Sequence, residues 1–220
     1  MRLIATDVTV PGPSPQHDPL LPPTSLVAEP GEVTLVPVGP EGSAREATAL
    51  ALALGGAVRL GGGSVDLWGE SDPHVLRRHV VLVDVEGVTA PEDALPATAV
   101  VREQLVLARR PSRGTAARRV LLEHGVADGS VRWDTLDPGD RTAILLDVAA
   151  RRPDAQVLVL AGPDRHGGDP RRWYAAARAQ ADTVLTVVVL CRPDTIAALA
   201  GPVTPTATTA TTASIEEVPA

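Results

Sequence analysis

Residues 37–46 read PVGPEGSARE and place glycines between an apolar run and a segment of helix-forming residues. A phosphate-binding loop of the form G-x-x-x-x-G-K-[ST] occupies this kind of turn. Its backbone N–H groups surround the phosphates, its Lys contacts the β- and γ-phosphates, and its hydroxyl binds Mg²⁺. Gly39, Gly42 and Ser43 fit that form. The backbone pattern of this stretch therefore matches a nucleotide site.

The side chains of the same stretch differ from the motif. Ala44 stands at the second motif glycine, Arg45 at the Lys, and Glu46 at the Ser or Thr. A carboxylate at Glu46 would lie where the metal-bound hydroxyl belongs and would repel phosphate oxygens. Taken alone, the stretch has a simpler interpretation as a Gly-Pro-rich turn between a strand and a helix.

Apolar patterns and turn residues predict the elements that would position this loop. Strands alternate with helices through most of the chain, and two helices between residues 92 and 135 follow one another without a strand. The expected strands include 2–10, 24–30, 31–39, 80–85, 156–160 and 183–190, and the expected helices include 44–54, 73–79, 97–110, 114–125, 140–152, 170–181 and one from Pro193. Such alternation indicates an α/β fold with a mostly parallel sheet covered on both faces.

Composition excludes several classes of function. The formal net charge is −7 and the arginines are interleaved with acids, so we expect no nucleic-acid partner. The single cysteine, Cys191, excludes an internal disulfide and is expected to be a small buried residue. The five histidines lack the spacing of a metal site, so no metal site is predicted. The longest apolar run, VLTVVVLC, is too short to cross a bilayer.

The chain divides into one domain and a tail. Residues 1–200 carry the alternating pattern, with the helical insert at about 92–135. Residues 201–220 are rich in Thr, Ala and Pro, contain no aromatic residue, and show no periodic apolar spacing. Because such a segment cannot bury enough apolar surface to order itself, we predict a disordered tail.

Taken in order, these segments resemble the nucleotide-binding domain of ABC transporters. PLLPPTSLVAEPGEVTLVPVGPEGSAREATALALALGGAVRLGGGSVDLWGE is similar to the opening of that family. RRHVVLVDVEG and ALPATAVVREQLVLA are similar to the stretch with the Q-loop and the start of the helical subdomain. LDPGDRTAILLDVAARRPDAQVLVLAGPD is similar to the LSGGQ signature, its helix and the Walker B strand. The resemblance covers about residues 1–195 and implies a P-loop NTPase-like cassette with an N-terminal antiparallel β region and an inserted helical subdomain.

The positions that carry the chemistry of this family are altered here. The resemblance implies a Walker B Asp that helps to hold Mg²⁺ and a Glu that polarises the attacking water, but these positions are Ala161 and Gly162, followed by the retained Pro163. Neither residue can accept a proton or offer a carboxylate to a metal. The sequence therefore predicts no catalytic residue at the end of this strand.

The other motifs of the family are degenerate as well. The Q-loop glutamine falls near Val85, and the switch histidine falls near Cys191 or Arg192. A proline in the signature removes one backbone N–H that could face a phosphate. The signature-like residues are Leu136, Asp137, Pro138, Gly139 and Asp140.

A polar segment, DRHGGD at 164–169, follows the Walker B-like strand. Ligands bind at the carboxyl ends of strands in α/β sheets, so this segment could line a site. A glycine-rich connecting loop is the simpler interpretation.

The resemblance implies an ABC transporter ATP-binding protein with ATP and Mg²⁺ as ligands. The altered residues predict a pseudo-ATPase with weak or no nucleotide binding and negligible hydrolysis. We expect a cytoplasmic protein that lies at the inner face of the cell membrane through a membrane-spanning transporter subunit or another membrane protein. Two hypotheses stay open. In the first, the chain is the inactive half of an asymmetric cassette pair whose competent partner supplies the working site; in the second, it is a nucleotide-independent scaffold or regulatory protein for a membrane protein. The expected partners include another cassette in a homo- or heterodimer.

The helical insert offers a surface for such a partner. In VVREQLVLARR, the apolar residues Val100, Val101, Leu105 and Leu107 cannot all face one side of a helix. Some apolar surface should therefore stay exposed after the insert packs on the domain.

Overall fold

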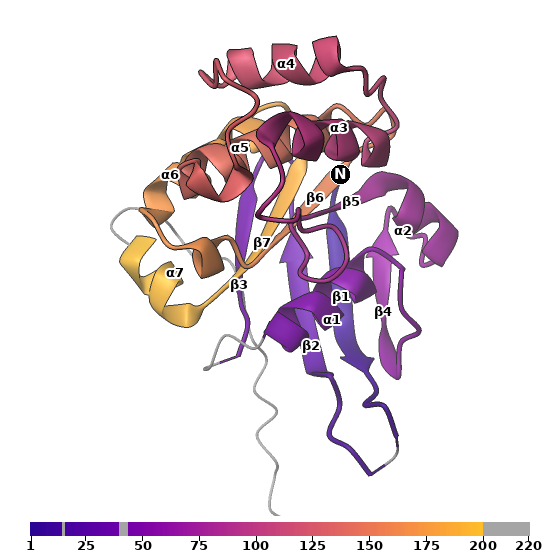
Figure 1. Ribbon diagram of the computed structural model, residues 1–220. Helices are drawn as coiled ribbons and strands as arrows, with labels where there is room; N and C mark the ends of the chain where they lie inside the picture. The colour runs from indigo at the N-terminus through magenta and orange to yellow at the C-terminus, as the bar shows by residue number, and fades with distance from the viewer. Residues whose placement is uncertain (15, 40–43, 200–220) are drawn as a thin grey trace, which may run out of the picture.

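The computed structural model describes residues 1–14, 16–39 and 44–199 and shows two β-sheets with helices packed around them (Figure 1). The predicted tail at 201–220 and the loop residues Gly42 and Ser43 lie outside the described residues. The predicted α/β class is confirmed, with one parallel and one antiparallel sheet.

The antiparallel sheet is built from the N-terminal part of the chain. It contains β1 (Leu3–Val10), β2 (Leu21–Ala28) and β4 (Gly62–Leu67) in the order β2-β1-β4. The prolines predict a second strand that starts only at residue 24, and this boundary is wrong. Pro22 and Pro23 belong to β2, which lies at the edge of the sheet, where a missing N–H donor is tolerated.

The parallel sheet contains four strands in the order β3-β7-β6-β5. These are β3 (Val33–Pro37), β5 (Val80–Val83), β6 (Val157–Ala161) and β7 (Thr186–Cys191). Every residue of β6 and β7 is buried, as expected for central strands covered on both faces. The carboxyl ends of the four strands meet at one edge, which places the segments after β3, β5, β6 and β7 close together.

Helices connect the strands at bounds close to those predicted. The helices are α1 (Ala44–Leu54), α2 (Pro73–His79), α3 (Ala97–Leu107), α4 (Gly114–Glu123), α5 (Pro138–Ala150), α6 (Pro170–Ala181) and α7 (Pro193–Leu199), with single turns of 3-10 helix at η1 (Trp133–Thr135) and η2 (Pro163–His166).

Three helices begin at an Asp-Pro pair, at Asp72, Asp137 and Asp169. In each, the Asp carboxylate accepts the N–H two residues later, at 2.8–2.9 Å, and the Pro occupies the first helical position. Proline fits there because that N–H has no partner inside the helix, and the Asp satisfies another free donor. Asp-Pro in the signature-like segment therefore has the same local role as in two helices outside it.

The core consists of two apolar layers, one on each face of the parallel sheet. Leu158 and Leu160 of β6 pack with α3, α4, α5 and α6, whereas Val157 and Val159 face α1 and the antiparallel sheet. Figure 1 shows α3 and α4 stacked over α5, away from β1 and β2. None of the helices in the described part of the chain has the length and apolar character that a bilayer crossing needs.

The two helices of the predicted insert are held on α5 by packing and by charged groups. Asp147 on α5 accepts from Nε2 of His124 at 3.1 Å and from Nη2 of Arg151 at 2.6 Å, and Arg151 also contacts Glu123 at 2.6 Å. Partial burial opposes ionisation of Asp147, but these hydrogen bonds outweigh it and lower the pKa of the carboxyl group. The contacts join the end of α4 to α5.

Candidate functional site

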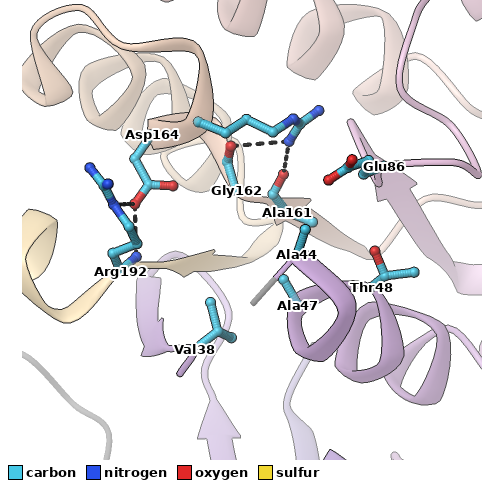
Figure 2. Close-up of a pocket in the computed structure, with 10 residues that line it drawn as sticks. Val38, Ala44, Ala47, Thr48, Glu86, Ala161, Gly162, Asp164 and Arg192 are labelled. Carbon is cyan, nitrogen blue, oxygen red and sulfur yellow. Dashed lines mark hydrogen bonds and ion pairs between the residues drawn. The ribbon is translucent and has the colours of Figure 1, made fainter. Parts of the chain in front are cut away.

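A cavity of about 190 Å³ lies where the carboxyl ends of β6 and β7 meet the start of α1 (Figure 2). Strand ends, the first turns of α1 and the loop after β5 all contribute to it. Its lining residues are Val38, Ala44, Ala47, Thr48, Glu86, Ala161, Gly162, Asp164, Arg165 and Arg192. Ligands of open α/β sheets bind at this kind of place.

The phosphate-loop candidates reach this region at the first turn of α1. Ala44 lines the cavity, and Arg45 lines an adjoining groove that runs along α1. Glu46 is half-buried in the same turn. Gly39 follows β3 with a φ of 37°, a backbone conformation that favours glycine. The structure thus places Gly39 just after β3 and Ala44, Arg45 and Glu46 in the first turn of α1.

The Walker B-like residues lie at the opposite wall of the cavity. Ala161 ends β6 with its side chain buried, and Gly162 adopts a left-handed conformation with a φ of 61°. What these residues present to the cavity is backbone: both carbonyl oxygens accept hydrogen bonds from Nη1 of Arg165, at 2.5 Å from Ala161 and 3.0 Å from Gly162 (Figure 2).

Asp84, which is not among the residues predicted from the sequence, completes this contact. It follows β5 and is 2% exposed, and its Oδ1 accepts from Nη2 of Arg165 at 2.6 Å while its Oδ2 lies 3.0 Å from Nε2 of His166. The signal available in the sequence was the position of Asp84, an acid directly after the apolar residues of β5. Two residues of the polar segment at 164–169, Arg165 and His166, thus contact Asp84 across the strand ends.

A second carboxylate, Asp164, is held on the other side of the cavity. Its Oδ2 accepts from the backbone N–H of Arg192 at 2.8 Å and from the hydroxyl of Thr195 at 3.0 Å. The adjacent Cys191 is fully buried, as predicted. Burial raises the pKa of its thiol to about 12, and the carboxylates of Asp164 and Asp194 add to this shift. At neutral pH Cys191 is therefore an uncharged thiol, and neither it nor Arg192 offers the histidine of a switch position.

The signature-like residues lie outside the cavity, at the start of α5. Leu136 precedes the helix, Asp137 caps it, and Pro138 and Gly139 form its first turn. Arg172 on α6 contacts Asp137 at 2.6 Å and Asp140 at 2.7 Å. A side chain at the Gly139 position would lie 2.6 Å from Cβ of Arg172, so α6 packs closely against this turn. The charges of this segment are engaged within the chain.

Two solved structures are similar to this chain over most of its length. A protein of Pyrococcus furiosus assigned as an ABC transporter ATP-binding protein superimposes with a TM-score of 0.60 at 13% identity, and the match covers 87% of this chain and 92% of that one. The ATP-binding subunit of an ABC transporter superimposes with a TM-score of 0.56 at 14% identity, covering 88% of this chain and 80% of that one. The chain has the ABC ATP-binding cassette fold. No family model and no curated protein matches the sequence.

Among the residues that the structure describes, the side chains around the cavity do not fit Mg²⁺ and ATP. Mg²⁺ is held in proteins by carboxylates together with water and phosphate oxygens. Ala161 and Gly162 offer only carbonyl oxygens that already accept from Arg165, and the carboxylate of Asp84 is paired. Glu86 and Asp164 bring two carboxylates to the cavity wall, and the two arginines of the wall, Arg165 and Arg192, already contact Asp84 and Asp164. The described wall therefore offers no unpaired arginine to a polyphosphate. Within the described ranges, no cluster of three or more His, Cys, Asp or Glu is placed to hold a metal ion.

Proposed function

We propose that this protein is a pseudo-ATPase with the ABC cassette fold, which docks on a membrane-spanning partner and neither requires nor hydrolyses Mg·ATP. The observation that carries the proposal is the cavity wall at β6. Where the resemblance implies two acids, Ala161 and Gly162 present carbonyl oxygens to the guanidinium of Arg165. The family resemblance implies docking on a membrane-spanning subunit as the role of such a cassette.

The surface of the helical insert supports docking. Of the four apolar residues in VVREQLVLARR considered above, Val100, Val101 and Leu105 are buried, whereas Leu107 is 47% exposed. Its neighbour Val106 is 59% exposed. We call Val106 and Leu107 the α3 end patch. A helix from a membrane-spanning subunit is the occupant that the family resemblance implies. The second structural neighbour is itself described as a subunit of an ABC transporter.

The scaffold hypothesis is favoured over the inactive half of a cassette pair. An inactive half would have to present its signature helix to a phosphate held by the other cassette. Here the start of α5 carries Asp137 and Asp140, both bound by Arg172, and Pro138 lacks an N–H. A phosphate approaching this helix end would meet two carboxylates, so we assign no role in trans to the signature-like segment.

Capture from native membranes tests the proposal. The tagged protein should fractionate with membranes and co-purify with one membrane-spanning protein, equally with Mg·ATP and after nucleotide is removed by apyrase and EDTA. Deleting the gene of that membrane protein should release the tagged chain into the soluble fraction.

Variants of the α3 end patch locate the contact. The double change Val106→Glu and Leu107→Glu should abolish co-purification, because it places two charges in an apolar contact. The matched control is Val27→Glu, an exposed apolar residue on β2 that should leave capture unchanged. A protein found only in the soluble fraction, or capture that needs Mg·ATP, would contradict the proposed function.

A further inference from the structure

We propose that Asp84 and the carbonyl groups of Ala161 and Gly162 form a cation site selective for a guanidinium group, and that the chain fills this site with its own Arg165. The inference deepens the proposed function. It rests on that proposal in one respect, namely that this site does not bind Mg·ATP. It assigns guanidinium compounds as the ligand class of the site and predicts that the site binds such a compound once Arg165 is shortened.

Three oxygens converge on one guanidinium. Nη1 of Arg165 donates to the carbonyl oxygens of Ala161 and Gly162, and Nη2 donates to Oδ1 of Asp84 at 2.6 Å. A planar fork of fixed N–H groups matches acceptors spread in this way, whereas an ammonium group has no such fork. The arrangement therefore selects for geometry as well as for charge.

The carboxylate of Asp84 needs a cation because it is 2% exposed. Removing a carboxylate from water is costly unless a charge and hydrogen bonds compensate it. His166 contacts only the other oxygen, Oδ2. Arg165 is the group that supplies a permanent positive charge, so its loss leaves a buried anion with incomplete compensation.

The backbone is shaped around the guanidinium. Gly162 has a φ of 61°, and a Cβ at this position would lie 3.3 Å from Nη1 of Arg165. Glycine therefore serves both the left-handed turn and the close approach of the arginine. The site also opens to solvent, because Arg165 lines the cavity and its side chain is 26% exposed. A small cation can reach the site once the side chain is shortened.

One carboxylate and two carbonyl groups favour a guanidinium over a divalent metal ion. Mg²⁺ requires near-octahedral oxygen ligands at short distances and gives up its water reluctantly, and Ca²⁺ takes six or more oxygens. Asp84 is the one carboxylate within hydrogen-bond reach of the Arg165 guanidinium among the contacts described. Methylguanidinium, which carries the same fork, is the probe that the site should accept.

The test is chemical rescue of Arg165→Ala, measured by thermal unfolding. The variant should melt roughly 5–10 °C below the parent protein, because a buried carboxylate loses its partner. Millimolar methylguanidinium chloride should restore most of this loss, while MgCl₂, CaCl₂ and NaCl at matched ionic strength should not. The parent protein should show no stabilisation by the same probe, since Arg165 occupies the site.

Two controls separate the site from general effects. Arg192→Ala removes another arginine of the same cavity and should not respond to methylguanidinium. Asp84→Asn combined with Arg165→Ala removes the buried charge. Because Asp84 has a φ of 57°, which Asn tolerates, this double variant should melt above Arg165→Ala and should not respond either. If Arg165→Ala fails to fold, Arg165→Gln is used with the same expectations.

Each outcome bears on the inference directly. Rescue confined to variants that lack Arg165 and retain Asp84 supports it. Three results would overturn the inference. Arg165→Ala could be stabilised by a divalent metal ion in place of methylguanidinium, the parent protein could be stabilised by methylguanidinium as much as the variant, or the melting temperature of Arg165→Ala could fail to rise with methylguanidinium. The experiment involves neither nucleotide nor membrane partner, so a failure here leaves the docking proposal standing, and a failed capture leaves this result unchanged.

Discussion

Arg172 on α6 holds Asp137 at the start of α5, with 2.6 Å between Nη1 and Oδ1. The same carboxylate caps the helix by accepting the N–H of Gly139 at 2.8 Å. One oxygen thus serves a helix cap and an ion pair between two helices. The signature-like position is a structural contact between α5 and α6, and its acid is explained without a ligand.

Removing the carboxylate of Asp137 should destabilise the protein. Asp137→Ala deletes the cap of α5, so we expect the free energy of unfolding to fall by roughly 0.5–2 kcal/mol. Asp137→Asn keeps an oxygen that can accept from Gly139 and loses only the charge. Since both partners of the ion pair are more than a third exposed, the Asn variant should stay close to the parent protein. Urea unfolding of both variants measures this, and equal losses for Ala and Asn would show that the ion pair outweighs the cap.

The contact between α4 and α5 should make stability depend on acid pH. The pKa of Asp147 is lowered in the folded protein, so its contribution is complete above the ordinary aspartate pKa of about 3.9 and is lost as the pH falls through the lower folded value. Asp147→Asn should lower the free energy of unfolding by roughly 1–2 kcal/mol at neutral pH.

The difference between Asp147→Asn and the parent protein should shrink below about pH 4, where the parent carboxylate is protonated in the unfolded chain. Unfolding curves of both proteins across the acid range provide the measurement. A difference that does not vary with pH would show that the ionisation of Asp147 contributes nothing to the contact.

Repairing the phosphate-binding loop should not create an ATPase. The triple variant Ala44→Gly, Arg45→Lys and Glu46→Thr restores the motif and should recover some nucleotide binding. Turnover should stay at the level of a mock purification, because Ala161 and Gly162 supply neither a metal ligand nor a group that positions water. Phosphate release by the triple variant above that level would show that the Walker B acids are dispensable here.

Local signals predicted most of the fold. The bounds of α1, α2 and α6 agree with the sequence prediction, because Pro73 and Pro170 mark helix starts and α1 is a run of helix-forming residues. The start of β2 at Leu21 was missed, since proline is usual in turns and only the edge position of the strand explains it.

The candidate site was harder to predict because it depends on pairs that are distant in sequence. Asp84 and Arg165 are 81 residues apart, and no local pattern indicates that they meet. Their contact depends on the parallel pairing of β5 with β6 and on the left-handed turn at Gly162. The sequence shows that no acid stands at 161 and 162, whereas only the structure shows that Arg165 contacts the carbonyl groups of these residues.

The central claim is that this ABC cassette fold lacks the chemistry that binds Mg·ATP, and thermal unfolding with nucleotide tests it most directly. A ligand at 100 times its dissociation constant would stabilise the folded protein by roughly 2.7 kcal/mol, which is about 5–10 °C for a chain of this size. We predict no Mg²⁺-dependent rise in the melting temperature of the parent protein at millimolar ATP. The triple variant Ala44→Gly, Arg45→Lys and Glu46→Thr is the control, because its melting temperature should rise with ATP if it recovers nucleotide binding. A clear rise in the parent protein that requires both ATP and Mg²⁺ would contradict the claim.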